Sequence, residues 1–123
     1  MAQRFGKAEK LKSRKWIEQL FAEGRSVRAY PIIAVYGFFD PVDKVPVKAG
    51  FSVSKRKFRK AVDRNLIKRR MREAYRLEKP AVILQTEPER TMAVMFIYMP
   101  SKAMEFEAIL PAFKKLMTEL NNV

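Results

Sequence analysis

The sequence predicts an α+β fold: a single domain of residues 1–123 in which helices and strands follow one another as α-β-β-α-β-α and helices pack on a short sheet. Apolar residues recur at helical spacing in three segments, and three other apolar runs have the length and composition of strands. Of the 123 residues, 48% are hydrophobic, which is enough for one core and argues against a second domain.

The first half of the chain predicts one helix and two strands. Apolar residues of Glu9–Glu23 fall on one helical face, and Gly24 is expected to end this helix in the left-handed conformation. The runs Tyr30–Phe39 and Val47–Lys55 are typical of strands, and Asp40–Lys44 between them is rich in turn residues. An antiparallel hairpin is therefore expected.

The second half predicts two more helices around one strand. Lys60–Glu78 lacks glycine and proline, so a helix that stops before Pro80 is expected. Arg90–Met99 is a continuous apolar run, which favours a strand buried on both faces. In Glu105–Leu120 apolar residues share one face, as in a helix that packs on a core.

The composition points to a polyanionic partner. Twenty-six Lys and Arg residues against thirteen Asp and Glu give a formal charge of +13, which favours nucleic acid. A solubility role and attraction to anionic membranes are the alternatives, but no basic helix with a bulky apolar face supports the membrane. Because no apolar run has the length of a membrane span or signal peptide, we expect a cytoplasmic protein with no membrane partner.

Two residue types with catalytic and metal-binding chemistry are absent. The chain has no cysteine and no histidine, which excludes disulfides, thiolate metal sites and every Ser-His or Cys-His arrangement. Acidic residues, such as the turn pair Asp40 and Asp43, are scattered rather than clustered as a metal nuclease requires. We expect no catalytic residue and no metal site in this chain. A metal nuclease that works without any partner is therefore less favoured than the two RNA-binding hypotheses given below.

The most informative segment is the strongly basic one between Lys55 and Arg76. It contains eleven Lys and Arg residues, opposed only by Asp63 and Glu73. The residues of this segment that we expect to bind RNA are Lys55, Arg56, Lys57, Arg59, Lys60, Arg64, Asn65, Lys68, Arg69, Arg72 and Arg76.

Helical geometry separates a basic stripe from an apolar face in this segment. The basic stripe consists of Arg64, Asn65, Lys68, Arg69, Arg72 and Arg76. The residues expected to face the core are Val62, Leu66, Ala74 and Leu77, with Ile67 or Met71 at the margin. Like charges four residues apart destabilise a helix, so an ordinary solvated face explains the stripe less well than bound phosphate. Because neither a helix-turn-helix partner nor a zipper is evident, RNA is favoured over DNA.

The motifs in this region resemble those of the bacterial ribonuclease P protein family. A strand ends in Ser52-Val53-Ser54-Lys55, and the helix reads Ala61-Val62-Asp63-Arg64-Asn65, followed by Lys68-Arg69 and Arg72-Glu73. The sequence departs from the family pattern at Leu66, where a second arginine is common. It also departs in the segment between Lys55 and Ala61, which lacks the usual glycine and is one residue longer.

The resemblance implies both a fold and a role. The fold would be an α/β sandwich with a left-handed βαβ crossover, similar to a domain of a ribosomal protein. The chain would be an accessory subunit of a ribonucleoprotein endoribonuclease, binding the catalytic RNA and the 5′ leader of precursor tRNA, with Mg²⁺ used by the RNA subunit. No obligate protein partner is implied. The competing hypothesis is a general structured-RNA-binding or ribosome-associated protein without a role in tRNA cleavage.

The resemblance also implies a cleft for the leader between the first helix and the sheet. Candidate residues of this cleft are Ile17, Phe21, Ser52 and Ser54. Phe21 would stack on a leader base, although an aromatic residue at helical spacing is more often part of the core. The two serines share a strand face and would line a polar groove, with an ordinary half-solvated strand as the alternative.

Overall fold

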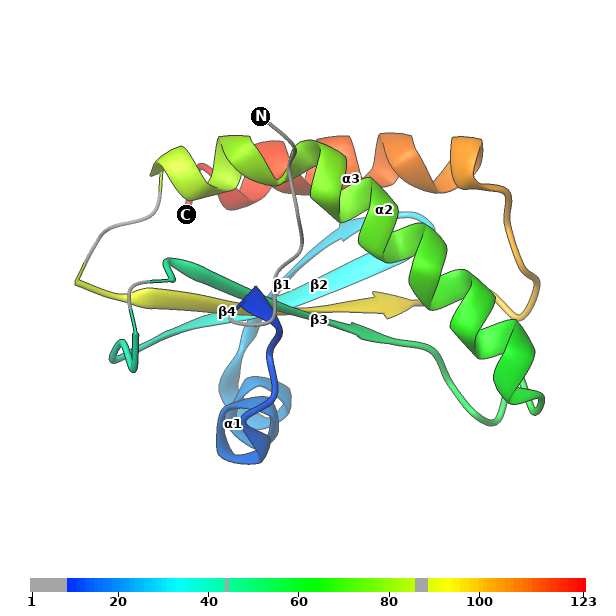
Figure 1. Ribbon diagram of the computed structural model, residues 1–123, viewed down its shortest axis with the longest axis horizontal. Coiled ribbons are helices and arrows are strands. Elements are labelled where there is room, and N and C mark those ends of the chain that lie inside the picture. The colour runs from blue at the N-terminus through cyan, green and yellow to red at the C-terminus, as the bar shows by residue number, and fades with distance from the viewer. Residues whose placement is uncertain (1–8, 44, 86–88) are drawn as a thin grey trace.

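The computed structural model describes residues 9–43, 45–85 and 89–123 (Figure 1). Within these ranges three helices and four strands follow one another, and a short strand precedes the first predicted one. The elements are α1 (Arg14–Glu23), β1 (Arg25–Ala29), β2 (Ile32–Phe39), β3 (Val47–Ser52), α2 (Ala61–Gln85), β4 (Thr91–Tyr98) and α3 (Phe106–Leu120).

The four strands form one sheet in the order β1-β2-β4-β3. The last strand, β4, lies in the middle, antiparallel to β2 and parallel to β3. Every residue of β4 except the half-buried Ile97 is buried, which confirms the expectation of a strand covered on both faces. The predicted hairpin between the second and third strands is wrong, because β4 separates them and β2 pairs with β1 instead.

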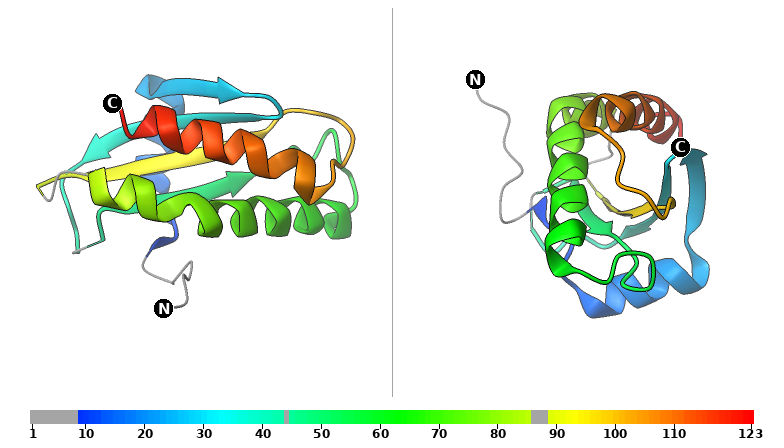
Figure 2. Two further views of the ribbon diagram at one scale, coloured as in Figure 1. Left: turned by 90° about the horizontal axis from the view of Figure 1, so that it is seen from above. Right: turned by 90° about the vertical axis from the view of Figure 1, so that its right-hand side faces the viewer.

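Helix α2 connects the two parallel strands, β3 and β4, across one face of the sheet. Seen from the helical side with both strands pointing upward, β4 lies to the left of β3, so the crossover is left-handed (Figure 2). Nearly all parallel crossovers are right-handed. The resemblance alone predicted this hand, and the structure agrees with it.

The helices cover the two faces of the sheet unequally. Helices α2 and α3 pack side by side on one face and enclose the larger core, which includes Phe96 and Phe113 (Figure 1). On the opposite face α1 crosses beneath the strands alone, and a small cluster around Leu20 and Met95 joins it to the sheet. Because α1 covers only part of this face, the ends of the strands extend beyond it.

Helix α1 starts later than predicted and ends differently. Ser13 is its N-cap and accepts a hydrogen bond from the Trp16 amide at 3.2 Å. Gly24 has φ −66° and ψ 154°, an extended conformation, so the predicted left-handed end is wrong. A Cβ on Gly24 would lie 2.4 Å from the Leu20 carbonyl oxygen and 2.8 Å from Val35 Cγ1. Glycine is therefore needed here for close approach rather than for a left-handed turn.

The N-terminal segment before α1 lies along the edge of β3. Lys10 forms a parallel bridge with Ala49, and the Leu11 amide donates to the Ala49 carbonyl at 2.9 Å. The Lys79 ammonium on α2 binds both carboxylate oxygens of Glu9 at 2.8 and 3.1 Å, and both side chains are largely buried. These contacts cover part of an edge strand that would otherwise be open.

Helix α2 continues through Pro80 to Gln85, so the prediction that it stops before the proline is wrong. Proline removes one backbone hydrogen bond from a helix interior. Long helices keep most of their stability from the face that they pack on the core, and α2 packs on both α3 and β3. The residues Ala81–Gln85 after the proline belong to this helix.

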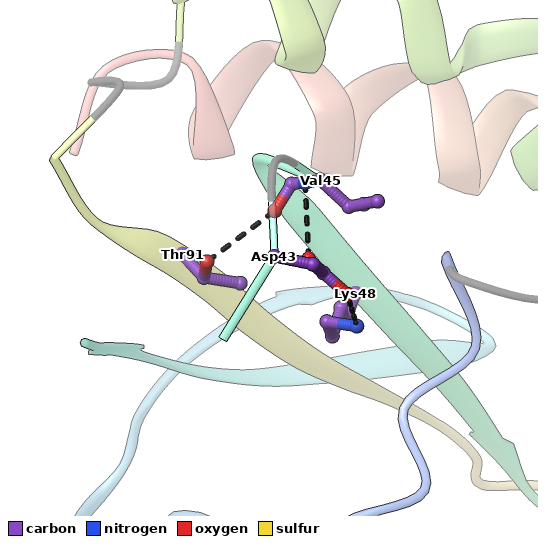
Figure 3. A network of polar contacts seen from close by, with 4 residues as sticks. All are labelled: Asp43, Val45, Lys48 and Thr91. Atoms are coloured by element: carbon purple, nitrogen blue, oxygen red, sulfur yellow. Dashed lines mark hydrogen bonds and ion pairs between the residues drawn. The ribbon is translucent and has the colours of Figure 1, made fainter. Parts of the chain in front are cut away.

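The loop between β2 and β3 is ordered by a network around Asp43 (Figure 3). The Asp43 carboxylate accepts from the Val45 amide at 3.0 Å and from the Lys48 ammonium at 2.8 Å. The Thr91 hydroxyl donates to the Val45 carbonyl at 3.3 Å, which ties the loop to the start of β4. Lys44, the last residue of the predicted turn, lies outside the described residues.

Candidate nucleic-acid interface

The loop from residue 53 to 60 presents a group of cations on a well-anchored turn. Val53 and Phe58 are buried at its two ends. Between them, the Ser54 hydroxyl accepts from the Arg56 amide at 3.2 Å and the Lys57 amide at 3.3 Å, and the Phe58 amide donates to the Ser54 carbonyl at 3.0 Å. The exposed cations of this loop are Lys55, Arg56, Lys57, Arg59 and Lys60.

Arg64 joins this loop to the first turns of α2. Its guanidinium nitrogen Nη1 donates to the Phe58 carbonyl at 2.7 Å and to the Arg59 carbonyl at 3.0 Å. Among the described residues no backbone φ is positive, so the loop closes without the glycine that is common in the family. One of the predicted RNA-binding residues therefore also holds the loop in place.

The buried face of α2 differs from the predicted one. Ile67, Met71, Ala74 and Tyr75 are fully buried. Two residues predicted to face the core are exposed instead: Val62 at 69% and Leu77 at 42%; a third, Leu66, is only half-buried. The prediction omitted Tyr75, whose large ring packs against Phe51 and Phe96 and turns this face of the helix toward the sheet.

Arg70 bonds to the Met104 carbonyl just before α3, and helical spacing places the basic stripe on the side of α2 away from Arg70 and α3. Helix α2 itself lies above the β3 edge of the sheet (Figure 2). Asn65 and Arg69 are exposed, and Lys68, Arg72 and Arg76 are half-buried. Half-buried long side chains keep their stems on the protein and their charged ends in solvent, which is the arrangement that a phosphate-binding surface requires.

Arg76 is partly neutralised within the chain. Its guanidinium donates to both Glu73 carboxylate oxygens, with Nε to Oε2 at 3.0 Å. This hydrogen bond lowers the pKa of Glu73 below its ordinary value and raises that of Arg76. We therefore expect Arg76 to contribute less to phosphate binding than Lys68 or Arg72.

The face of the sheet toward α1 carries a row of side chains that crosses all four strands. Arg28 pairs with Ile33, Ile33 with Ile97, and Ser52 with Ile97. Their neighbours along each strand, such as Phe96, belong to the core on the other face, so alternation directs this row toward the α1 side. Ile33, Ile97 and Ser52 are half-buried, and Arg28 is exposed.

Two candidate cleft residues lie on α1, which packs on this face of the sheet. Trp16 stacks on Phe39 with ring centroids 4.6 Å apart, so that flank of α1 points to the end of β2. At helical spacing Ile17 and Phe21 lie on the other flank, toward Ile97. Ile17 packs in the α1 cluster, while Phe21 is 57% exposed. Ile17 thus packs in the same cluster as Ile97, while Phe21 is exposed on the flank of α1 away from Trp16.

Ser54 differs from the other three cleft candidates. It follows the end of β3, and its hydroxyl oxygen accepts the two backbone hydrogen bonds of the turn. Its visible role is therefore to shape the basic loop that follows.

The sequence reasoning missed several exposed cations near this surface. Lys10, Lys12, Arg14 and Lys15 precede or begin α1 and are all exposed. Lys10 pairs with β3, which brings these charges to the same edge of the sheet as the α2 stripe. Arg28 was missed because β1 itself was not predicted. The density of Lys and Arg between residues 10 and 15 was the available signal.

The described part of the chain offers neither a metal cluster nor a membrane helix. Within it, no three Asp or Glu side chains gather in a way that could hold a metal ion. Of the helices described, none is long and apolar enough to cross a membrane.

The fold and this surface define a small basic α+β protein that binds a polyanion. A family model described as Ribonuclease P matches residues 5–121. The chain belongs to the ribonuclease P protein family, and it is an accessory subunit of the ribonucleoprotein endoribonuclease that processes tRNA 5′ ends.

Individual relatives agree with this assignment. The "Ribonuclease P protein component" of Porphyromonas gingivalis is 32% identical over 116 residues, which are 93% of this chain and 84% of that protein. That of Chlorobaculum tepidum is 42% identical over 66 residues, 51% of this chain and 43% of that protein. The solved RNase P protein of Staphylococcus aureus has a TM-score of 0.70 at 23% identity and covers 92% of this chain and 95% of that one, which supports the fold.

Proposed function

We propose that the chain binds the catalytic RNA through the basic loop and the α2 stripe, and the 5′ leader of precursor tRNA on the α1 side of the sheet. This division rests on one observation: two unlike surfaces, the α2 stripe and the row on the α1 side of the sheet, both reach the edge strand β3. The α2 stripe is dense in guanidinium groups, which suit the phosphates of folded RNA. The row through Ile33 and Ile97 is apolar with polar ends, which suits bases of a single strand.

The protein contributes binding and charge neutralisation rather than bond cleavage. Two RNA molecules that meet in one complex repel each other, and Lys and Arg residues between them reduce that repulsion. The Mg²⁺ ions used in the reaction belong to the RNA subunit, in keeping with the scattered carboxylates of this chain. Because its substrate is precursor tRNA, the complex acts in the cytoplasm. Besides the RNA subunit, the protein requires no protein partner.

The experiment is cleavage of a precursor tRNA by a bacterial ribonuclease P RNA at low Mg²⁺ and moderate salt. The variant Lys68→Gln/Arg69→Gln/Arg72→Gln removes three stripe charges and leaves the loop contacts of Arg64 intact. A matched control, Arg25→Gln/Lys114→Gln/Lys115→Gln, removes three exposed charges elsewhere.

We expect stimulation that requires both RNA and protein, is lost in the stripe variant and remains in the control. Phe21→Ala should weaken binding of precursor tRNA about five- to tenfold while binding of leaderless tRNA stays unchanged. RNA binding without stimulation would favour a general RNA-binding protein, and cleavage by protein alone would contradict the assignment of chemistry to the RNA.

A further inference from the structure

A hollow of about 560 Å³ lies at the end of the sheet, beyond the row that contains Ile33 and Ile97. Its size is within the roughly 300–1,000 Å³ range of small-molecule pockets. Tyr30, at the turn between β1 and β2, forms one wall and is 69% exposed. The hollow is lined by Tyr30, Lys57, Met99, Pro100, Ser101, Lys102 and Met104.

The segment from Met99 to Met104, which lines the hollow with Tyr30, is held in place by the side chains of Tyr98, Arg70 and Lys57. The Tyr98 hydroxyl donates to the Lys102 carbonyl at 2.6 Å and accepts from the Met104 amide at 2.9 Å. The Arg70 guanidinium donates to the Met104 carbonyl at 2.7 Å, and the Lys57 ammonium donates to the Met99 carbonyl. The segment between β4 and α3 is therefore pre-organised, which lowers the entropic cost of binding.

The chemistry of the hollow combines one exposed aromatic ring with positive charge. Lys57 and Lys102 are its charged lining residues, and the described lining includes no carboxylate. An aromatic ring beside ammonium groups suits a nucleotide, because the base stacks on the ring while the phosphate binds the cation. A purely apolar ligand would gain nothing from the two lysines.

The hollow shares Lys57 with the basic loop and lies at the same end of the sheet as the row through Ile33 and Ile97. The Met99 amide donates to the Pro31 carbonyl at 2.9 Å, two residues along the strands beyond the paired Ile33 and Ile97. A single strand of RNA that crosses the row of Ile33 and Ile97, from α1 toward the ends of β3 and β4, would arrive at Tyr30.

The geometry points to a nucleotide-binding subsite in which an unpaired RNA base stacks on Tyr30 and its phosphate binds Lys57 and Lys102. This subsite rests on the proposed function, since it extends the path of a single-stranded segment that lies on the α1 side of the sheet. It lies beyond the leader-binding surface proposed beside α1, and its residues come from the β1–β2 turn, the basic loop and the β4–α3 segment.

The test measures binding of an eight-nucleotide oligoadenylate RNA to the full chain by fluorescence anisotropy. Tyr30→Ala should weaken binding about five- to tenfold, whereas Tyr30→Phe, which keeps the ring, should stay within about twofold. Lys102→Gln should weaken binding and flatten its salt dependence, while Lys115→Gln, on α3, should change it less. Val42→Ala is the control for removing an exposed apolar side chain at a distance and should leave binding unchanged.

A second measurement reports stacking directly. The chain has one tryptophan, so Trp16→Phe/Tyr30→Trp places the only indole at the hollow. Oligoadenylate should quench its fluorescence, and an abasic octamer of equal charge should not. Equal binding by Tyr30→Ala and the unmodified chain, or equal quenching by the abasic octamer, would overturn the subsite. Neither assay contains the catalytic RNA, so these results are independent of cleavage stimulation, whose loss would overturn the proposed function instead.

Discussion

The guanidinium of Arg64 and the hydroxyl of Ser54 both bond to the backbone of the loop that is expected to bind RNA. Arg76 likewise binds Glu73. The sequence motif identified these positions but could not distinguish a group that contacts RNA from one that positions its neighbours. Such roles depend on which backbone carbonyls and amides lie within hydrogen-bond distance after folding.

Ser54→Ala tests the positioning role of this hydroxyl. It removes the acceptor of the Arg56 and Lys57 amides, so the free energy of unfolding should fall by about 1 kcal/mol. Ser52→Ala, two residues earlier on β3, is the matched control and should change stability less. Urea unfolding of both variants makes the comparison. An equal effect of the two substitutions would show that the turn does not depend on Ser54.

Asp43→Asn tests the network of the β2–β3 loop through its pH dependence. The hydrogen bond from Lys48, with that from the Val45 amide, lowers the pKa of Asp43. A carboxyl group with a lowered pKa stabilises the fold fully above its unfolded pKa and loses this contribution as the pH falls through its folded pKa. The stability difference between the original chain and the variant should therefore be constant from about pH 7 to 5 and shrink below about pH 4. Urea unfolding at several pH values measures it, and a pH-independent difference would contradict the network.

At the scale of elements, local patterns predicted helices and buried strands better than their pairing. The fully apolar run of β4 correctly indicated a strand buried on both faces. Its insertion between β2 and β3 was missed, because strand order depends on contacts between residues far apart in the chain. β1, with its polar and charged residues, carries a weak strand signal. It was missed for that reason, and the hairpin was assigned to the wrong pair.

Gly24→Ala tests how α1 meets the sheet. The new Cβ would lie 2.4 Å from the backbone oxygen of Leu20 in α1 and 2.8 Å from Val35 Cγ1 on β2, so both the end of the helix and its contact with β2 must shift. We expect the free energy of unfolding to fall by about 2–3 kcal/mol. Gly37→Ala is the comparison: its Cβ would lie 3.1 Å from the flexible end of the Leu20 side chain, and the loss should be below about 1 kcal/mol. Thermal unfolding that ranks the two variants in the opposite order would contradict this packing.

At the scale of the whole molecule, the candidate site is assembled from segments that are distant in sequence. The motif between Ser52 and Glu73 predicted the α2 stripe and the basic loop from sequence alone. The row that pairs Arg28 with Ile33 and Ile97 with Ser52 required the register of all four strands. No local pattern contains that register, so Arg28 and the hollow at Tyr30 were visible only in the folded chain.

The net charge of +13 has a consequence for the free protein. Repulsion within the basic stripe opposes folding, and an anion that binds there relieves it. Sulfate at about ten times its dissociation constant should stabilise the chain by about 1.4 kcal/mol. Thermal unfolding in sodium sulfate and in sodium chloride at equal ionic strength measures this. The Lys68→Gln/Arg69→Gln/Arg72→Gln variant should gain less from sulfate, and an equal gain would place the anion elsewhere.

The location of the RNA interface is tested most directly by the salt dependence of affinity for a bacterial ribonuclease P RNA. If about five phosphates are neutralised, the logarithm of the association constant should fall against the logarithm of salt concentration with a slope of roughly −3 to −5. The Lys68→Gln/Arg69→Gln/Arg72→Gln variant should bind more weakly with a slope smaller by roughly two to three, and the Arg25→Gln/Lys114→Gln/Lys115→Gln control should keep the original slope. An unchanged slope in the stripe variant would contradict an interface on α2. A smaller slope in the control variant instead would contradict it as well.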